Sequence, residues 1–243
     1  MNKKVSFFIS ISFTLLFIGN YFFFFIGSDE REKVVIGRVI DGDTIELNDG
    51  RKVRLLNINS PEKWEFGYEE ATKYLKNFEK LTLEMETEGV GKYGRELGRL
   101  FLNDNYLNLE IVELGLAHPY IVENEELKKF KKAENKARDK KLGIWKNSVE
   151  EGCLNVEINK KDEYVYIEND CGNLAGWKIK DESTKTYEFA NFYSEKFKLY
   201  SSKGVDENEK LYWGKEKVWN DDKDSIFIRD SEGFLVYYDS YGY

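Results

Sequence analysis

The hydrophobic pattern of this chain changes its period near residue 150, and that change limits the possible folds more than any other feature. Before it, alternating segments at 33–40, 43–48, 51–58, 81–88 and 95–103 are interrupted or followed by helical patterns at 65–80, 106–117 and 123–145. Five short strands interrupted by a helix, with helices after them, are typical of an OB-type barrel. We therefore expect an α+β domain over residues 31–148, an OB-fold five-stranded barrel with helices.

From about residue 152 to 243 the sequence contains only short strand patterns, spaced about a dozen residues apart, and no helical period. Many short strands at such spacing are typical of a β-sandwich. The second predicted domain, residues 152–243, is therefore all-β.

The two cysteines, Cys153 and Cys171, bracket two alternating segments at 154–159 and 164–169. A hairpin with its turn near residue 162 would place the cysteines opposite each other at its open end, where a disulfide can form. In an exported chain we expect this bridge; the alternative is two unrelated buried thiols.

The N-terminal segment Val5 to Gly27 is uncharged over 23 residues. At about 1.5 Å per residue, a helix of this length would cross a hydrocarbon core of about 30 Å. Lys3 and Lys4 precede it, which predicts a cytoplasmic N-terminus. Residues 1–28 are thus a predicted transmembrane signal anchor or a cleaved signal peptide. The bulk of the chain is expected outside the cytoplasm, at the cell membrane or secreted.

The charge of the chain is uneven: residues 31–150 carry 23 acidic and 22 basic side chains, whereas residues 151–243 carry 20 and 13. The acidic second domain would repel nucleic acid, so a phosphate-binding site is expected in the first domain, from positioned basic residues.

The segment 37–62 and the motif KYGRELGR concentrate side chains suited to phosphodiester chemistry. Arginine binds phosphate in a bidentate manner, and carboxylate oxygens bind hard cations. Asp41 is interpreted as a turn residue and Arg99 as a solvated one, and His118 as structural or at the surface. The remaining candidates are Asp43, Arg54, Glu62 and Arg95.

Five ordered motifs between Lys33 and Trp145 resemble the thermonuclease family, the staphylococcal-nuclease-like domains. This resemblance implies an OB-fold, calcium-dependent nuclease that cuts DNA and RNA. It implies that Asp43 binds Ca²⁺, with Thr44 and the carbonyl of Ser60 against the metal. It also implies that Arg54 and Arg95 bind phosphate and that Glu62 is the general base. The motifs are VIDGDTIEL, VRLLNINSPE, KYGRELGRLF, VELGLAHPYI and KARDKKLGIW.

Two positions depart from the family pattern. Asn59 stands in NSPE where the family usually has Asp, and Gly91 precedes KYGR where many members have Asp. The amide oxygen of Asn59 can still bind Ca²⁺, but the site loses one negative charge. We therefore expect weaker metal binding, or a requirement for extracellular calcium concentrations.

The second domain is similar to lamin-tail domains, through LAGWKIKD, VWNDDKD and IRDSEGFLV. This likeness implies an immunoglobulin-like β-sandwich with Trp177 and Trp219 in its core. It implies no catalytic site.

The sequence therefore predicts a tethered or secreted, calcium-dependent endonuclease acting on DNA, RNA or both. The alternative is a catalytically weakened OB-fold surface protein that binds nucleic acid. The other predicted partner is a membrane, through residues 5–27, and no protein partner is identifiable.

Overall fold

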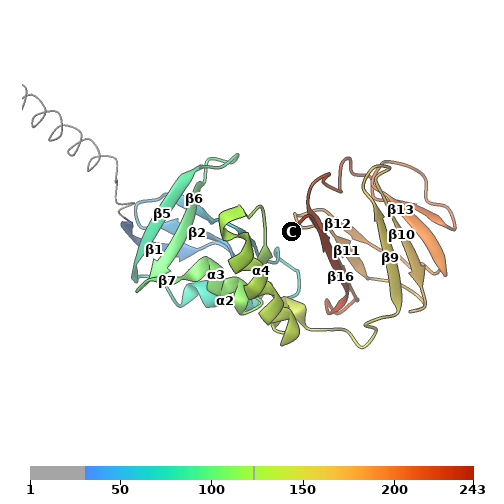
Figure 1. The fold of residues 1–243 in the computed structure, drawn as a ribbon, viewed down its shortest axis with the longest axis horizontal. Coiled ribbons are helices and arrows are strands. Elements are labelled where there is room, and N and C mark those ends of the chain that lie inside the picture. Colours follow the sequence, from blue (N-terminus) through green and yellow to red (C-terminus); the bar gives the residue numbers. More distant parts are fainter. Residues whose placement is uncertain (1–30, 123) are drawn as a thin grey trace, which may run out of the picture.

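The computed structural model describes residues 31–122 and 124–243, and its first part is a closed barrel (Figure 1). The sheet order is β3-β2-β1-β5-β6-β7, and a parallel pairing of β3 with β6 closes five of these strands into a barrel, which fits the OB-fold expected from the sequence. In β1, buried Val34 and Ile36 alternate with exposed or half-buried neighbours, as a strand with one inward face requires. The strands are β1 (Glu32–Val39), β2 (Thr44–Leu47), β3 (Lys52–Leu55), β5 (Thr82–Val90), β6 (Glu96–Leu102) and β7 (Asn105–Tyr106).

Three helices pack on this barrel: α2 (Tyr68–Lys76), α3 (Leu107–Glu113) and α4 (Asn124–Asp139). The buried residues Phe130, Ala133 and Ala137 of α4 follow the helical spacing expected from the sequence. A short pair, β4 (Ile58–Asn59) with β8 (His118–Pro119), joins the segment after β3 to the segment after α3. The 3-10 turn η1 (Gly143–Trp145) ends this part of the chain.

The second part consists of two four-stranded sheets that share one hydrophobic core. Trp177 and Trp219 are buried in this core, as the sequence predicts. The disulfide between Cys153 and Cys171 is present, with the two Cα atoms 5.1 Å apart. One sheet contains β9 (Leu154–Asn159), β10 (Tyr164–Asn169), β13 (Lys196–Tyr200) and β14 (Lys210–Tyr212); the other contains β11 (Lys178–Lys180), β12 (Thr186–Glu188), β15 (Asp224–Arg229) and β16 (Leu235–Tyr241).

The sheet that contains β11, β15 and β16 faces the barrel domain (Figure 1). A separate hydrophobic cluster joins the two parts: Ile144 and Trp145 from the first pack with Phe227 and Leu235 from the second. The ring centres of Trp145 and Phe227 lie 5.8 Å apart. Each such aromatic contact contributes about 0.5–1.5 kcal/mol beyond the burial itself. The two parts are therefore docked through a hydrophobic contact and are not merely joined by the chain.

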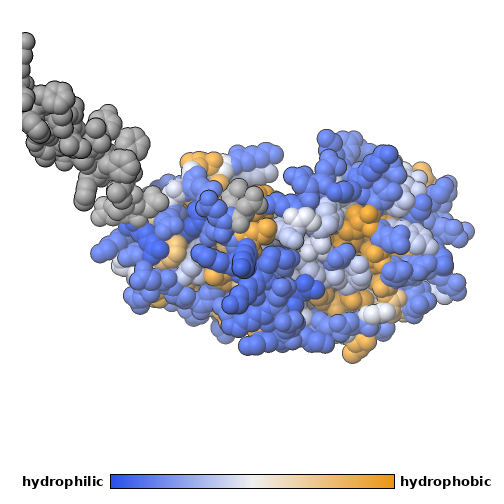
Figure 2. Space-filling view, in the orientation of Figure 1, coloured by the Kyte–Doolittle hydropathy of each residue, from blue (hydrophilic) through white to orange (hydrophobic). Residues whose placement is uncertain are grey.

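Much of the face shown in Figure 2 is hydrophilic, with apolar areas between. Among the described residues, no helix combines the length and apolar character needed to cross a membrane. The predicted signal anchor, residues 1–28, lies outside the part of the chain that the structure describes.

Candidate active site

The carboxylate of Asp43 is the centre of a network of contacts at the start of β2. It is buried, accepts a hydrogen bond from the backbone N–H of Ser60 at 2.8 Å and one from the hydroxyl of Thr44 at 3.0 Å. The Nε atom of Arg54 lies 3.1 Å from the same carboxylate. The turn chemistry of the DGDT segment thus presents Asp43 to the segment that follows β3.

Arg54 extends from β3 and is fixed by three further acceptors. Its guanidinium donates to the backbone carbonyls of Leu55 and Ile58, each at 2.8 Å, and to Oδ1 of Asn59 at 2.9 Å. Removing one partner of a buried ion pair costs about 3–5 kcal/mol, because the other charge is left uncompensated. Asp43 and Arg54 therefore hold each other in position.

Asn59 connects this site to the second domain. Its side chain is buried; Oδ1 accepts from Arg54, and Nδ2 donates to the carbonyl oxygens of Glu182 and Ser183, both at 3.2 Å. These three contacts fix the orientation of the amide, since Arg54 requires an acceptor and the carbonyls require a donor. A carboxylate at this position would place an oxygen against two carbonyl oxygens. The amide that departs from the family pattern therefore matches the docked second domain.

Arg95 lies in the turn between β5 and β6, and its Nη1 donates to the hydroxyl of Thr44 at 3.2 Å. The Thr44 hydroxyl thus links Arg95 to Asp43. Glu62 is exposed after Pro61, and its backbone N–H binds the carboxylate of Glu65 at 2.8 Å. Its side chain has no hydrogen bond or ion pair within residues 31–122 and 124–243.

Contacts thus join six of the seven residues predicted from the sequence, and only Glu62 stays outside the network. The six are Asp43, Thr44, Arg54, Asn59, Ser60 and Arg95.

Asp41 belongs to the same turn, where its Oδ1 accepts the backbone N–H of Asp43 at 3.0 Å. Burial, and then the charge of Asp43, raise the pKa of Asp41 to about 6. Two carboxylates held close together, with amide and hydroxyl oxygens beside them, suit a hard divalent cation. Among the described residues no group of three or more His, Cys, Asp or Glu gathers at a metal site, so a cation here would also need water or phosphate oxygens.

Two other residues lie in structural contacts. His118 is buried against Phe227, with ring centres 4.9 Å apart, and burial followed by the charge of Lys180 lowers its pKa to about 3. It is neutral near pH 7 and structural, as expected.

The prediction that Arg99 is solvated is wrong: it forms ion pairs with Glu88 at 2.5 Å and Glu126 at 2.9 Å. The reason is that β6 places it beside acids from β5 and α4.

No local signal in the sequence marks Glu182 and Ser183 as neighbours of this site. They follow Asn59 by more than 120 residues and lie in the loop between β11 and β12. Only the docking of the second domain brings their carbonyls to Asn59.

The side chain of Glu182 provides a test of this loop. Burial is the main cause that raises its pKa from 4.5 to about 7, and the charges of Asp224 and Asp181 add to it. The folded protein holds a proton that the unfolded chain releases over this interval, so stability should fall as the pH rises from about 4.5 to 7. In Glu182→Gln we expect a smaller loss of thermal stability between pH 5 and pH 8 than in the wild type.

Exposed Glu188 on β12 supplies the matched control for that measurement. Glu188→Gln should retain the pH dependence of the wild type. Identical curves for Glu182→Gln and the wild type would contradict the burial argument.

Comparison with known proteins identifies the first domain. The family model for staphylococcal nuclease homologues matches residues 52–147. A thermonuclease of Staphylococcus intermedius is 33% identical over 128 residues, which cover 47% of this chain and 76% of that protein. An uncharacterized endonuclease of Escherichia coli O157:H7 is 34% identical over 116 residues, covering 46% of this chain and 75% of that protein. The chain therefore belongs to the family of staphylococcal nuclease homologues and is, by that membership, an endonuclease.

Proposed function

We propose that this protein hydrolyses phosphodiester bonds of DNA, RNA or both with the help of Ca²⁺ at Asp43. The contact network around Asp43 carries this proposal, because it gathers oxygen ligands and two arginines, and the exposed acid Glu62 follows Ser60 of this network by two residues. Asn59, Thr44 and Ser60 would complete the protein side of the metal site. A bound Ca²⁺ would supply positive charge for a phosphate oxygen.

Three side chains of this site would carry out the remaining chemical steps. Glu62 would take the proton of the attacking water, whose oxygen forms a bond to phosphorus. Arg54 and Arg95 would neutralise the charge that develops on the phosphoryl oxygens. The bond from phosphorus to the 5′ oxygen breaks, and that oxygen takes up a proton from solvent. Since Arg54 already has four acceptors, Arg95, with one, is the arginine freer to turn toward phosphate.

We further propose that the second domain is a lamin-tail-like, immunoglobulin-like sandwich and that the protein acts outside the cytoplasm, anchored through residues 5–27 or secreted. Two facing four-stranded sheets with buried Trp177 and Trp219 support the first statement. The disulfide supports the second, because such bridges persist in oxidising compartments.

Cleavage of single-stranded DNA by residues 30–243 tests the catalytic proposal. We expect cleavage with millimolar Ca²⁺, none with a chelator, and a loss of about 10²–10³-fold in kcat for Arg95→Ala. Arg38→Ala removes an exposed arginine of β1 and should keep full activity. Equal cleavage with Ca²⁺ and with chelator would contradict the metal site, and no cleavage at all would favour a nucleic-acid-binding role.

A further inference from the structure

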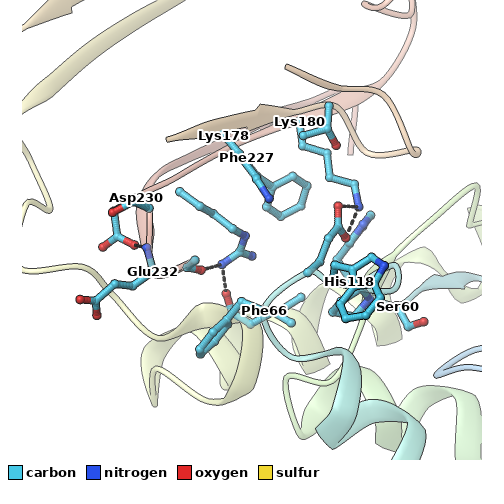
Figure 3. Close-up of a pocket in the computed structure, with 16 residues that line it drawn as sticks. Ser60, Phe66, His118, Lys178, Lys180, Phe227, Asp230 and Glu232 are labelled. Carbon is cyan, nitrogen blue, oxygen red and sulfur yellow. Dashed lines mark hydrogen bonds and ion pairs between the residues drawn. The ribbon is translucent and has the colours of Figure 1, made fainter. Parts of the chain in front are cut away.

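A cavity of about 120 Å³ lies between the two domains, beside the segment that leads from Asn59 to Glu62 (Figure 3). Ser60 and Pro61 line it from the barrel domain, and β11 and β15 line it from the other. By this measure a site for one water needs about 10–15 Å³, so the cavity is several times larger than a single water requires.

Two cations face this cavity from neighbouring strands. Lys178 on β11 and Arg229 on β15 are direct partners in the antiparallel register. Like charges placed opposite each other on a sheet are destabilising. Lys178 is partly neutralised by exposed Glu188, 3.7 Å away on β12, and an anion between Lys178 and Arg229 would offset the remaining repulsion. Arg229 uses Nη1 to donate to the carbonyls of Ile144 and Gly233, at 2.8 and 3.1 Å. Its other three N–H donors have no protein partner in the described part of the chain, and burial lowers its pKa to about 10.

The acids that line the cavity are engaged elsewhere or exposed. Glu65 forms an ion pair with Lys180 at 2.6 Å, which also removes Lys180 as a free cation (Figure 3). Asp230 accepts the backbone N–H groups of Glu232 and Phe234 in a turn, and the Glu232 side chain is exposed. The place for an anion is therefore the Lys178 and Arg229 edge, not the cavity as a whole.

Aromatic side chains line the barrel side of the same cavity. Trp64 is 85% exposed and has a backbone φ of 76°, a conformation that bulky residues rarely adopt. Such strain persists where the surrounding structure imposes it, often at ligand sites. Phe66 lines the cavity next to it and packs on Phe234, with ring centres 5.0 Å apart. An exposed indole beside a fixed phenyl ring is suited to stacking on a base.

Ser60 belongs to both sites: its backbone N–H donates to the carboxylate of Asp43, and the residue also lines the cavity. We propose that the cavity is a nucleotide subsite for the substrate strand next to the scissile phosphodiester. A base would stack on Trp64 and Phe66, and a phosphate would bind between Lys178 and Arg229. This inference rests on the proposed nuclease function and assigns the second domain a part in substrate binding, despite its net acidity.

Binding of a fluorescently labelled single-stranded thymidine decamer, followed by anisotropy with chelator present, tests the subsite without turnover. We expect Kd to rise about 5–150-fold in Trp64→Ala, since stacking is worth about 1–3 kcal/mol per base and about 1.36 kcal/mol is tenfold. Lys178→Ala should weaken binding and reduce the slope of log Kd against log salt concentration by about one, the effect of losing one phosphate contact. Trp64 is 85% exposed and the Lys178 side chain is 41% exposed, so neither change should unfold the protein.

Lys203→Ala, which removes an exposed lysine outside the cavity, is the matched control and should bind as the wild type does. Unchanged Kd in both Trp64→Ala and Lys178→Ala would overturn the subsite. Cleavage of the decamer with Ca²⁺ separates the two proposals. If the wild type cleaves the decamer and both variants bind and cleave as it does, only the subsite is refuted. If the wild type binds the decamer without cleaving it, and both variants bind it more weakly, only the catalytic proposal is refuted.

Discussion

Glu62→Gln is expected to lower kcat for single-stranded DNA by about 10²–10⁴-fold, the usual contribution of a general base. The amide keeps the shape of the side chain but cannot accept the proton of water. Because Glu62 is exposed, and its side chain forms no hydrogen bond or ion pair in the described part of the chain, thermal stability should not change. KM should change little, since no binding interaction is removed.

Glu69→Gln, an exposed acid on α2, is the matched control and should cleave normally. Comparable kcat for Glu62→Gln and the wild type would exclude Glu62 as the base. A loss of kcat together with a lower melting temperature would instead indicate a structural role for Glu62 that the structure does not predict.

Asn59→Asp restores the residue usual in the family, yet we expect it to destabilise this protein when no metal is present. The change removes two donors to the carbonyls of Glu182 and Ser183 and sets a charged oxygen against them. Leaving buried acceptors unpaired costs about 1–3 kcal/mol each, so two would cost about 2–6 kcal/mol; with the offset from Arg54, the free energy of unfolding should fall by about 2–4 kcal/mol. The stronger pair with Arg54 offsets part of this loss.

Urea unfolding and limited proteolysis of the segment between Trp145 and Leu154 measure this effect. In Asn59→Asp the segment should be cut faster, because the second domain docks less firmly, and added Ca²⁺ should recover stability by binding the new carboxylate. Asn57→Asp is the control: Asn57 is also buried, but its amide binds Glu126 within the barrel domain. It should lose stability without faster cutting of the segment. Wild-type stability and proteolysis in metal-free Asn59→Asp would contradict the docking role of Asn59.

The barrel was predictable because its information is local. Alternation in β1 to β3, the DGD turn and the spacing of α4 each describe neighbours a few residues apart, and the structure contains these elements close to the predicted positions. Ordered motifs also predicted seven candidate site residues in the first domain, and six of them lie in one contact network. Arg99 was not, since its partners Glu88 and Glu126 come from two other elements.

The sequence by itself determined the strand and helix periods, the order of the motifs, the cysteine pair and the substitution of Asn for Asp at position 59. The tertiary structure alone decided what that substitution means. Asn59 meets carbonyls more than 120 residues away, and Lys178 meets Arg229 through the register of β11 with β15. Contacts of this kind depend on how two parts with separate hydrophobic cores dock. Docking is determined by the shapes and polar groups of whole surfaces, which no local pattern of residues encodes.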